Sequence, residues 1–351
     1  MVPVGKVAAA RKLAAAAAYG GGGVSLLGAS LYGVLTTEAK LARRAIGDPL
    51  DDLVQDATGW YGRHRPGPGI RLALLGDSSA VGYGVDDVEQ TPGARLASGL
   101  AEAADRRVYL RALCAVGAQS CDLADQIDLA LPNDPDVAVL LIGANDVTHR
   151  VRPSESVRLL ELGVRRLRDA GVDVVVGTCP DLGTIEPIAP PLRQVARSWS
   201  RRLAAAQTIA VVEAGGRTVS LGSILGPEFA ASPSVLFGPD QFHPSAAGYA
   251  SLASVLLPSV LAAVGATRPE EVEPEAFRGE GVLPISYAAV EAARTPGTEI
   301  DGTEVGGSKR GIRGRWVLLR HRRRQPEVDI EGPEPAPDAS ADANVATEAP
   351  A

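Results

Sequence analysis

The sequence predicts an α/β fold built around a parallel sheet, for three reasons. Short continuous runs of apolar residues recur along the chain, as in strands that are buried on both faces. Longer segments with a helical spacing of apolar residues separate these runs. Ala, Gly, Val and Leu are abundant and charged residues make up 22% of the chain, which is typical of an ordered domain. Strands and helices that alternate in this way form a parallel sheet with helices on both faces.

The alternation can be followed from residue 70 to residue 264. Strands are expected at residues 70–75, 108–113, 137–142, 172–177 and, more weakly, 218–221. Helices are expected at residues 93–104, 123–131, 154–170, 192–214 and 245–264. About five strands fit a flavodoxin-like three-layer α/β/α sandwich better than a barrel. Such sheets bind ligands at the carboxyl ends of their strands, so polar residues that follow a strand are candidates for a site.

Changes in composition divide the chain into four parts. Residues 1–44 form an N-terminal membrane anchor or signal region, residues 45–69 a linker, and residues 70–265 the α/β domain. Residues 266–351 are expected to be a low-complexity extension, with one short helix near 286–294, a basic segment at 309–324 and an acidic tail. Two interpretations of the basic segment remain: a solvated, disordered run of charge, or a surface that contacts anionic lipid through Trp316 and Leu318.

The N-terminal region contains an uncharged stretch at residues 13–35, 23 residues long, which suffices for a membrane-spanning helix. The apolar part of a signal peptide is usually shorter, and no clear A-x-A cleavage site follows, so an uncleaved anchor is favoured over a cleaved signal. A soluble Ala-rich helix is less favoured because it would normally have a polar face. Basic residues flank the stretch almost equally and leave its orientation open: Lys6, Arg11 and Lys12 precede it, and Lys40, Arg43 and Arg44 follow it.

Composition argues against several functions. A net charge of −7 and an aromatic content of 4% disfavour nucleic acid as a partner. The three cysteines form no CxxC pair and the four histidines are widely separated, so neither a metal site nor another cofactor is predicted. Cys114 and Cys121 form a disulfide in an exported domain or remain small buried thiols, and Cys179 is left free in either case.

Polar or glycine-containing clusters follow the first three expected strands. Gly76-Asp77-Ser78 follows the first and places a serine at the ligand-binding edge, although Asp and Ser are also common helix caps. Gly117 follows the second strand and can present its backbone N–H to a ligand, unless it is a plain turn glycine. Asn145 follows the third strand with a donor amide, and an Asx-turn is its alternative role. Ser78 N–H, Gly117 N–H and the Asn145 amide are therefore the expected donors of an oxyanion hole.

A fourth cluster, Asp240-Gln241-Phe242-His243-Pro244, precedes the last helix. Asp240 and His243 are three residues apart in a short loop, so the carboxylate can orient the imidazole. The imidazole can then take a proton from Ser78. Pro244 is expected at the first position of the helix, with His243 just outside it. A surface histidine beside a proline-initiated helix is the alternative. The four clusters together predict nucleophilic catalysis by Ser78, Asp240 and His243.

These clusters resemble the four blocks of the SGNH hydrolases, the GDSL-like lipases and esterases. The matching residues are Ser78, Gly117, Asn145 and His243, and the resemblance covers about residues 68–265. It implies a flavodoxin-like fold, no metal, and ester hydrolysis through an acyl-serine intermediate. The first block here reads Gly-Asp-Ser-Ser, without the Leu of GDSL, which is a common variation.

The expected function is hydrolysis of carboxylic esters with short acyl or acetyl groups, carried by small molecules, carbohydrates or lipids. Phospholipase, thioesterase or acyltransferase activity with the same triad remains open. So does a non-catalytic, membrane-tethered module that binds carbohydrate or lipid. An anchor at residues 13–35 and a charged tail resemble exported hydrolases, which implies an extracytoplasmic catalytic domain, with secretion as the alternative.

Overall fold

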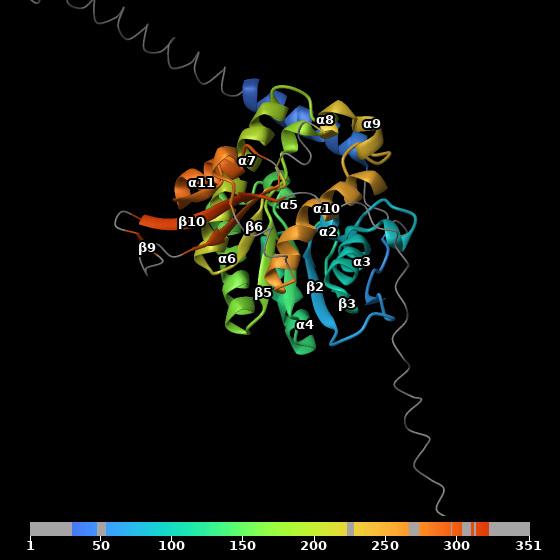
Figure 1. The fold of residues 1–351 in the computed structure, drawn as a ribbon. Helices are drawn as coiled ribbons and strands as arrows, with labels where there is room; N and C mark the ends of the chain where they lie inside the picture. Colours follow the sequence, from blue (N-terminus) through green and yellow to red (C-terminus); the bar gives the residue numbers. More distant parts are fainter. Residues whose placement is uncertain are drawn as a thin grey trace, which may run out of the picture.

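A computed structural model describes residues 30–47, 54–222, 228–266, 274–295, 297–303, 310–311 and 314–322. Its centre is one large sheet with helices packed on both faces (Figure 1). Five strands are parallel and run in the order β3-β2-β4-β5-β6. They are β2 (Ile70–Gly76), β3 (Val108–Ala112), β4 (Val137–Leu141), β5 (Asp173–Gly177) and β6 (Arg217–Val219). This confirms the expected three-layer α/β/α fold with five parallel strands.

Helices on the two faces of the sheet explain why the strands are continuously apolar. The helices α3 (Pro92–Ala104) and α10 (Ala246–Ala263) pack on one face, and α4 (Leu123–Ala130), α6 (Pro153–Asp169) and α7 (Leu192–Glu213) pack on the other. Successive side chains of β2 enter the two cores in turn. Leu72 and Leu74 join the α3–α10 core, whereas Ala73 and Leu75 join the α4–α6 core.

Short elements connect the layers. The short α-helices are α2 (Ser78–Val81), α5 (Ala144–Thr148), α8 (Phe229–Ala231) and α9 (Pro233–Leu236). The 3-10 turns are η2 (Val88–Gln90), η3 (Ser120–Asp122), η4 (Leu131–Asn133), η5 (Leu182–Thr184) and η8 (Ala276–Arg278). Because α2, η3, α5 and η5 each follow a parallel strand, they lie at the carboxyl edge of the sheet.

Antiparallel strands extend the sheet on both sides, which corrects two expectations. In the expected linker, β1 (Gly59–Tyr61) pairs with β3. In the expected low-complexity extension, β8 (Thr298–Gly302) pairs with β6, β10 (Gly314–His321) with β8, and β7 (Gly281–Pro284) with β10. The extension also contains β9 (Arg310–Gly311) and α11 (Ile285–Ala292), the latter close to the helix expected near 286–294.

The basic segment is therefore neither a disordered run nor a free lipid-binding tail over residues 314–321, where it forms β10. Val317 and Leu319 are buried beneath α11 and pack with Ile300 of β8. Glu299 is buried and accepts hydrogen bonds from Arg322, just after β10, at 2.5 and 2.9 Å. Arg217 of β6 lies 3.6 Å from the same carboxylate. An acid 23 positions away thus pairs with a cation of this segment at the end of the strand.

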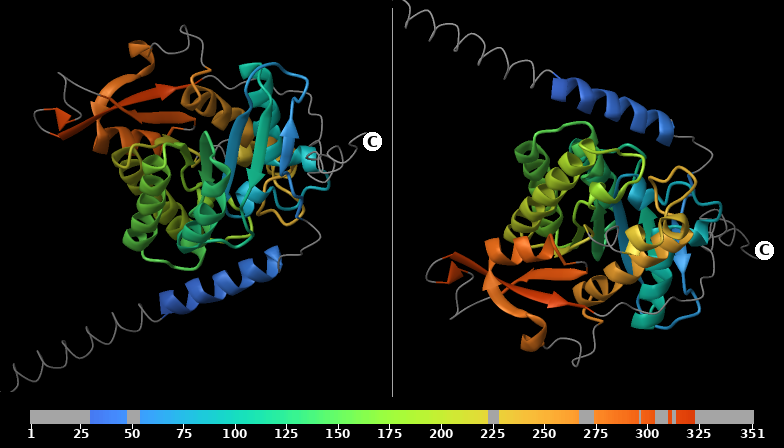
Figure 2. Two further views of the ribbon diagram at one scale, coloured as in Figure 1. Left: turned by 90° about the horizontal axis from the view of Figure 1, so that it is seen from below. Right: turned by 90° about the horizontal axis from the view of Figure 1, so that it is seen from above.

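A helix at residues 30–46 lies against the carboxyl edge of the domain (Figures 1 and 2). Its Ala42 is buried among residues of α7 and of the η5–α7 loop, and Glu38 Oε2 accepts a hydrogen bond from Leu192 N at 2.9 Å. Residues 13–29 of the expected membrane anchor lie outside the described residues. Within the described part of the chain, α10 is the one helix long and apolar enough to span a membrane, and 61% of it is buried in the domain.

Candidate active site

The turn that carries Ser78 is formed where β2 ends. Gly76 has φ +136°, and a Cβ on this residue would lie 1.9 Å from Leu141 O, so only glycine fits beside β4. Asp77 N donates to the same carbonyl at 3.0 Å. The Asp77 side chain then caps α2 by accepting a hydrogen bond from Ser79 N at 2.9 Å. Ser78 is thereby held at the first position of α2, with 7% of its surface exposed.

The structure brings Ser78, His243 and Asp240 together, although 165 positions separate the first two in sequence. His243 Nε2 lies 3.1 Å from Ser78 Oγ, and His243 Nδ1 lies 2.6 Å from Asp240 Oδ2. The other oxygen of Asp240 accepts the backbone N–H groups of Phe242 and His243, both at 3.0 Å. The carboxylate therefore fixes the loop and the ring at once. A proton on Nδ1 leaves Nε2 as the acceptor for the serine hydroxyl.

The loop that presents His243 is closed at its base. Gly238 N donates to His243 O at 2.8 Å, and Phe237 forms a bridge with Pro244. The helix α10 begins at Ala246, with Ser245 as its N-cap. Pro244 thus precedes the cap and is not the first helical residue as expected. The bridge between Phe237 and Pro244, and not the start of the helix, therefore restrains His243.

Burial and hydrogen bonding have opposite effects on the pKa values of the two carboxyl groups of the site. Burial raises the pKa of Asp240, but hydrogen bonds from the His243 ring and Phe242 N outweigh it, so the pKa lies below its ordinary value. Asp77 is wholly buried, and this desolvation raises its pKa to about 6 despite the hydrogen bond from Ser79. Asp240 is therefore the anion that can stabilise an imidazolium at neutral pH.

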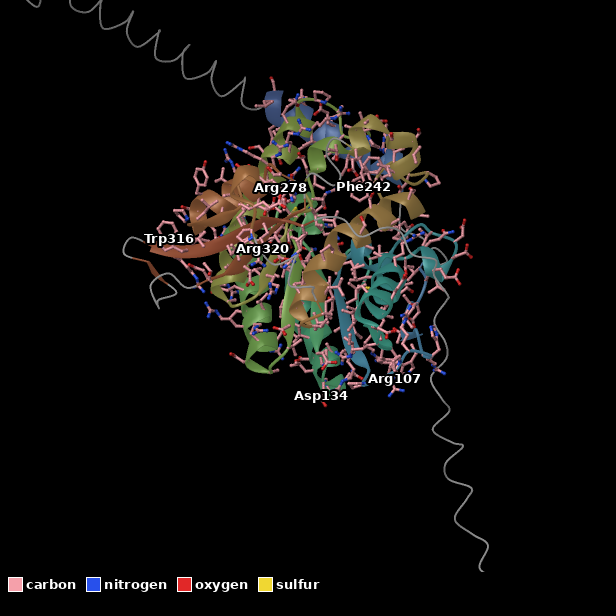
Figure 3. The ribbon with its side chains drawn as sticks, in the orientation of Figure 1. Arg107, Asp134, Phe242, Arg278, Trp316 and Arg320 are labelled. Carbon is pink, nitrogen blue, oxygen red and sulfur yellow. The ribbon has the colours of Figure 1, made fainter. Side chains whose placement is uncertain are left out.

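Two aromatic rings hold the imidazole. Tyr83 lies 4.5 Å from the His243 ring centroid on a tilted plane, and Phe242 lies 4.8 Å away with its edge toward the ring. Tyr249 Oη donates to Tyr83 O at 3.0 Å, which ties this packing to α10. Phe242 lies near the upper edge of the molecule in Figure 3. Aromatic packing at these distances restricts rotation of the histidine ring.

Gly117 and Asn145 lie at the same edge as Ser78. Ala115 N donates to Gly76 O at 3.0 Å, which joins the loop after β3 to the turn that carries Ser78. Asn145 Nδ2 donates to Ala118 O at 3.0 Å and connects the loop after β4 to the loop after β3. Gly117 has φ +82°, and a Cβ added to this residue would meet no atom within 4 Å beyond its chain neighbours. Its N–H lies in an open loop next to the serine turn.

A buried carboxylate joins the loop after β3 to the loop after β4. Asp146 accepts hydrogen bonds from Ser120 N at 3.0 Å, Ser120 Oγ at 2.5 Å and Ser156 Oγ at 2.7 Å. His149 Nδ1 lies 2.9 Å from Asn145 O, which places this histidine as an anchor of its own loop. Asp146 and His149 therefore support the position of Asn145.

Two buried glutamines hold the strand ends, and the sequence analysis did not identify either. Gln126 of α4 accepts from Gly76 N at 2.8 Å and donates to Gly76 O at 3.0 Å. Gln207 of α7 donates to Ile142 O at 3.0 Å and accepts from Cys179 N at 2.8 Å. A polar residue on the apolar face of a helix was the available signal, but the partners lie 28 to 65 positions away.

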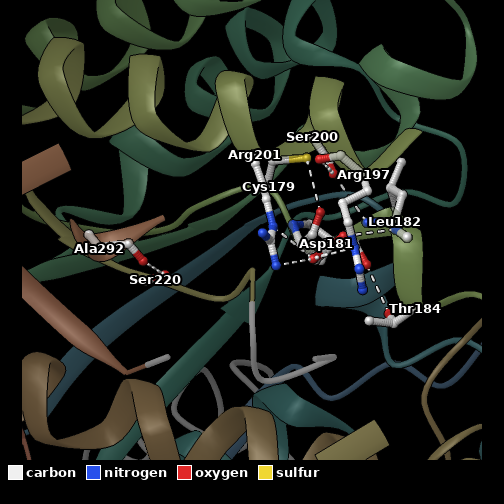
Figure 4. Close-up of polar contacts among 11 residues, drawn as sticks. Cys179, Asp181, Leu182, Thr184, Arg197, Ser200, Arg201, Ser220 and Ala292 are labelled. Atoms are coloured by element: carbon white, nitrogen blue, oxygen red, sulfur yellow. Dashed lines mark hydrogen bonds and ion pairs between the residues drawn. The ribbon is translucent and has the colours of Figure 1, made fainter. Parts of the chain in front are cut away.

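The loop after β5 completes the edge (Figure 4). Asp181 is buried, caps η5 through Gly183 N, and pairs with Arg201 at 2.9 Å and Arg197 at 3.4 Å. Cys179 is buried, and Cys114 and Cys121 are both free thiols, so the disulfide alternative is not realised.

A cavity of about 550 Å³ lies at the opposite, amino edge of the sheet, lined among others by Arg71, Asp134 and Asp136. Asp134 marks this edge in Figure 3. None of the predicted site residues lines it, so cavity size alone would misplace the site. No group of three or more His, Cys, Asp or Glu side chains suited to a metal ion occurs among the described residues.

Comparison with known proteins gives one family. A family model described as GDSL-like lipase/acylhydrolase matches residues 74–251. A GDSL-like esterase of Mycobacterium tuberculosis is 46% identical over 189 residues, which are 53% of this chain and 60% of that protein. The match thus spans less than two thirds of that relative.

Two solved structures are similar to a little over half of this chain. An α/β-hydrolase enzyme from the metagenome of Lake Arreo, Spain, is 20% identical, with 57% of this chain and 96% of that chain covered and a TM-score of 0.44. A mutant acetyl-xylooligosaccharide esterase of Geobacillus stearothermophilus is 16% identical, with 58% and 99% covered and a TM-score of 0.43.

Proposed function

Because the chain belongs to the GDSL-like lipase/acylhydrolase family, we propose that it is a serine hydrolase that cleaves carboxylic esters through an acyl-Ser78 intermediate. The observation that supports this most strongly is the continuous chain of contacts from Ser78 Oγ through the His243 ring to Asp240. Nucleophile, base and orienting carboxylate stand within hydrogen-bonding distance of one another, as nucleophilic catalysis by serine requires.

In the first half-reaction, Ser78 Oγ attacks the ester carbonyl while His243 Nε2 takes its proton. Asp240 stabilises the resulting imidazolium through Nδ1–H. The tetrahedral intermediate collapses when the imidazolium protonates the leaving alkoxide. Water then attacks the acyl-enzyme with the same histidine as base, and the acid is released.

The oxyanion of each intermediate is assigned to Ser78 N–H, Gly117 N–H and the Asn145 amide. Support comes from the hydrogen bonds that join the three loops at one edge, from Ala115 to Gly76 and from Asn145 to Ala118. One amide hydrogen of Asn145 is used by Ala118, and the second is the proposed donor. A donor of this kind contributes about 3–4 kcal/mol to catalysis.

Short acyl groups, acetyl above all, are the proposed substrates, on a carbohydrate, a small lipid or another small alcohol. Phospholipase, thioesterase and acyltransferase activities use the same triad and are separated by chain-length profiling with competing alcohols.

The test is hydrolysis of p-nitrophenyl acetate by the full chain and by the Ser78→Ala variant. Wild type is expected to release p-nitrophenol and the variant to lose at least about 10³-fold in kcat, as for other nucleophile deletions. Equal rates would remove Ser78 from the mechanism. No turnover and no labelling of wild type by a fluorophosphonate would favour a non-catalytic binding module.

Membrane anchoring through residues 13–35, with an extracytoplasmic catalytic domain, completes the proposal. It is supported by the 23 uncharged residues of this segment. Protease digestion of intact cells tests it: cleavage of the catalytic domain at the cell surface is expected, and full protection contradicts it.

A further inference from the structure

We propose that the carboxyl edge of the domain docks on an anionic lipid bilayer through a basic surface beside the catalytic site. This basic surface consists of Lys40, Arg43 and Arg44 on helix 30–46 and of Arg150 and Arg152 between α5 and α6. The inference rests on the proposed membrane anchoring, and it adds which face of the domain meets the membrane.

Helix 30–46 continues the uncharged segment into the active-site edge. Its first six residues, 30–35, are also the last six of the uncharged stretch 13–35. With a rise of about 1.5 Å per residue, Arg43 lies roughly 12 Å along the helix from Leu35. A bilayer that holds residues 13–35 is therefore close to the basic residues of the same helix.

The helix is fixed to the edge by three contacts. Ala42 is buried in a cluster that includes Val147 and against which Phe242 packs. Glu38 accepts the hydrogen bond from Leu192 N, and Arg43 Nη2 donates to Thr148 O at 3.3 Å. Phe242 also packs on the His243 ring, so the helix and this histidine adjoin the same apolar cluster.

The outer side of the helix is cationic. Lys40 and Arg44 each stand two residues from buried Ala42, which places them about 200° around the helix from it, on the solvent side. Both are exposed, and so are Arg43, Arg150 and Arg152.

Positive charge dominates helix 30–46 and the segments beside it. Helix 30–46, residues 149–152 and residues 185–191 together contain five Lys or Arg residues and two acids, Glu38 and Glu186. The whole chain, in contrast, has a net charge of −7. A local excess of cations in an acidic protein is the pattern expected of a surface that faces anionic headgroups.

Apolar side chains frame the same edge. Leu31, Val34 and Leu41 on helix 30–46, Val195 on α7 and Val235 on α9 are exposed. Apolar groups beside basic ones favour the boundary between headgroups and acyl chains. Docking in this position turns the edge that holds Ser78 toward the bilayer, so esters carried at the membrane surface reach it directly.

The test uses the full chain in nanodiscs of phosphatidylcholine, with or without phosphatidylglycerol, and measures amide hydrogen exchange by mass spectrometry. Exchange of residues 36–46 and 149–152 is expected to slow about fivefold or more when the anionic lipid is present. Raising the ionic strength should reverse the effect because it screens exposed charges.

The double variant K40E/R44E is expected to lose the lipid-dependent protection. R107E/R165E is the matched control: it makes the same change of charge at exposed residues of the amino edge and of α6 (Arg107 is marked in Figure 3), and should keep the protection. The proposal is overturned if exchange is equal in the two lipids or if both variants lose the protection equally. It is also overturned if another face is protected or if the chain does not associate with the discs.

Hydrolysis of p-nitrophenyl acetate in the same discs separates this inference from the proposed function. Protection without hydrolysis leaves the docking surface standing and rejects the esterase. Hydrolysis without lipid-dependent protection supports the esterase and rejects the docking surface.

Discussion

Replacing Gln126 with Leu removes the amide that is hydrogen-bonded to Gly76 in the turn before Ser78. The wild-type side chain makes two hydrogen bonds to Gly76, at 2.8 and 3.0 Å, inside the core. Gly76 O retains Ala115 N as a donor, whereas Gly76 N loses its acceptor and stays buried. An unpaired buried N–H costs about 1–3 kcal/mol and the second lost bond about 1 kcal/mol, so the free energy of unfolding should fall by about 2–4 kcal/mol.

Urea unfolding followed by circular dichroism measures this loss. Gln194→Leu is the control, because Gln194 is exposed on α7 and should change the free energy by less than about 0.5 kcal/mol. Since Gly76 lies two residues before Ser78, kcat of Q126L for p-nitrophenyl acetate should fall as well. A Q126L protein as stable as the control would refute the assignment of Gln126 as the support of this turn.

Three further variants test separate parts of the site. Asp240→Asn should lower kcat/KM by about 10²–10⁴-fold with a near-normal fold, because the imidazole loses its anionic partner; an unchanged rate in the ester assay would exclude this carboxylate. Burial raises the pKa of Asp77 to about 6, so its ionisation should cost wild type about 2 kcal/mol of stability as pH rises from 4 to 7. Asp77→Asn should lack this decline in urea titrations, and an identical decline would contradict it. Gly76→Ala should fail to fold, because its Cβ would meet Leu141 O, whereas Gly84→Ala, also at positive φ but in open space, should lose only about 1 kcal/mol; equal melting temperatures of the two would refute the argument.

Local patterns in the sequence were sufficient for the parallel sheet, and they proposed residues for the site that the structure brings to one edge. The run 70–75 is apolar at both faces because helices cover both, and Ser78 follows it directly. Asp240 and His243 were identifiable because their contact lies within one short loop. Their distance from Ser78 depends on the order of strands and becomes visible only in the structure.

The elements that were missed depend on contacts between distant residues. Gln126 and Gln207 gain their roles from backbone groups 28 to 65 positions away. The strand β10 lies in a segment whose charges look incompatible with a sheet until Glu299 is placed beside Arg322. A sequence read in short windows contains no signal for these pairings.

Mass spectrometry of the full chain after reaction with a fluorophosphonate shows directly whether Ser78 is the nucleophile. We expect one adduct, on the peptide that contains Ser78, and much slower labelling in His243→Ala, which lacks the base 3.1 Å from the hydroxyl. An adduct on another serine, or labelling of His243→Ala at the wild-type rate, would contradict it.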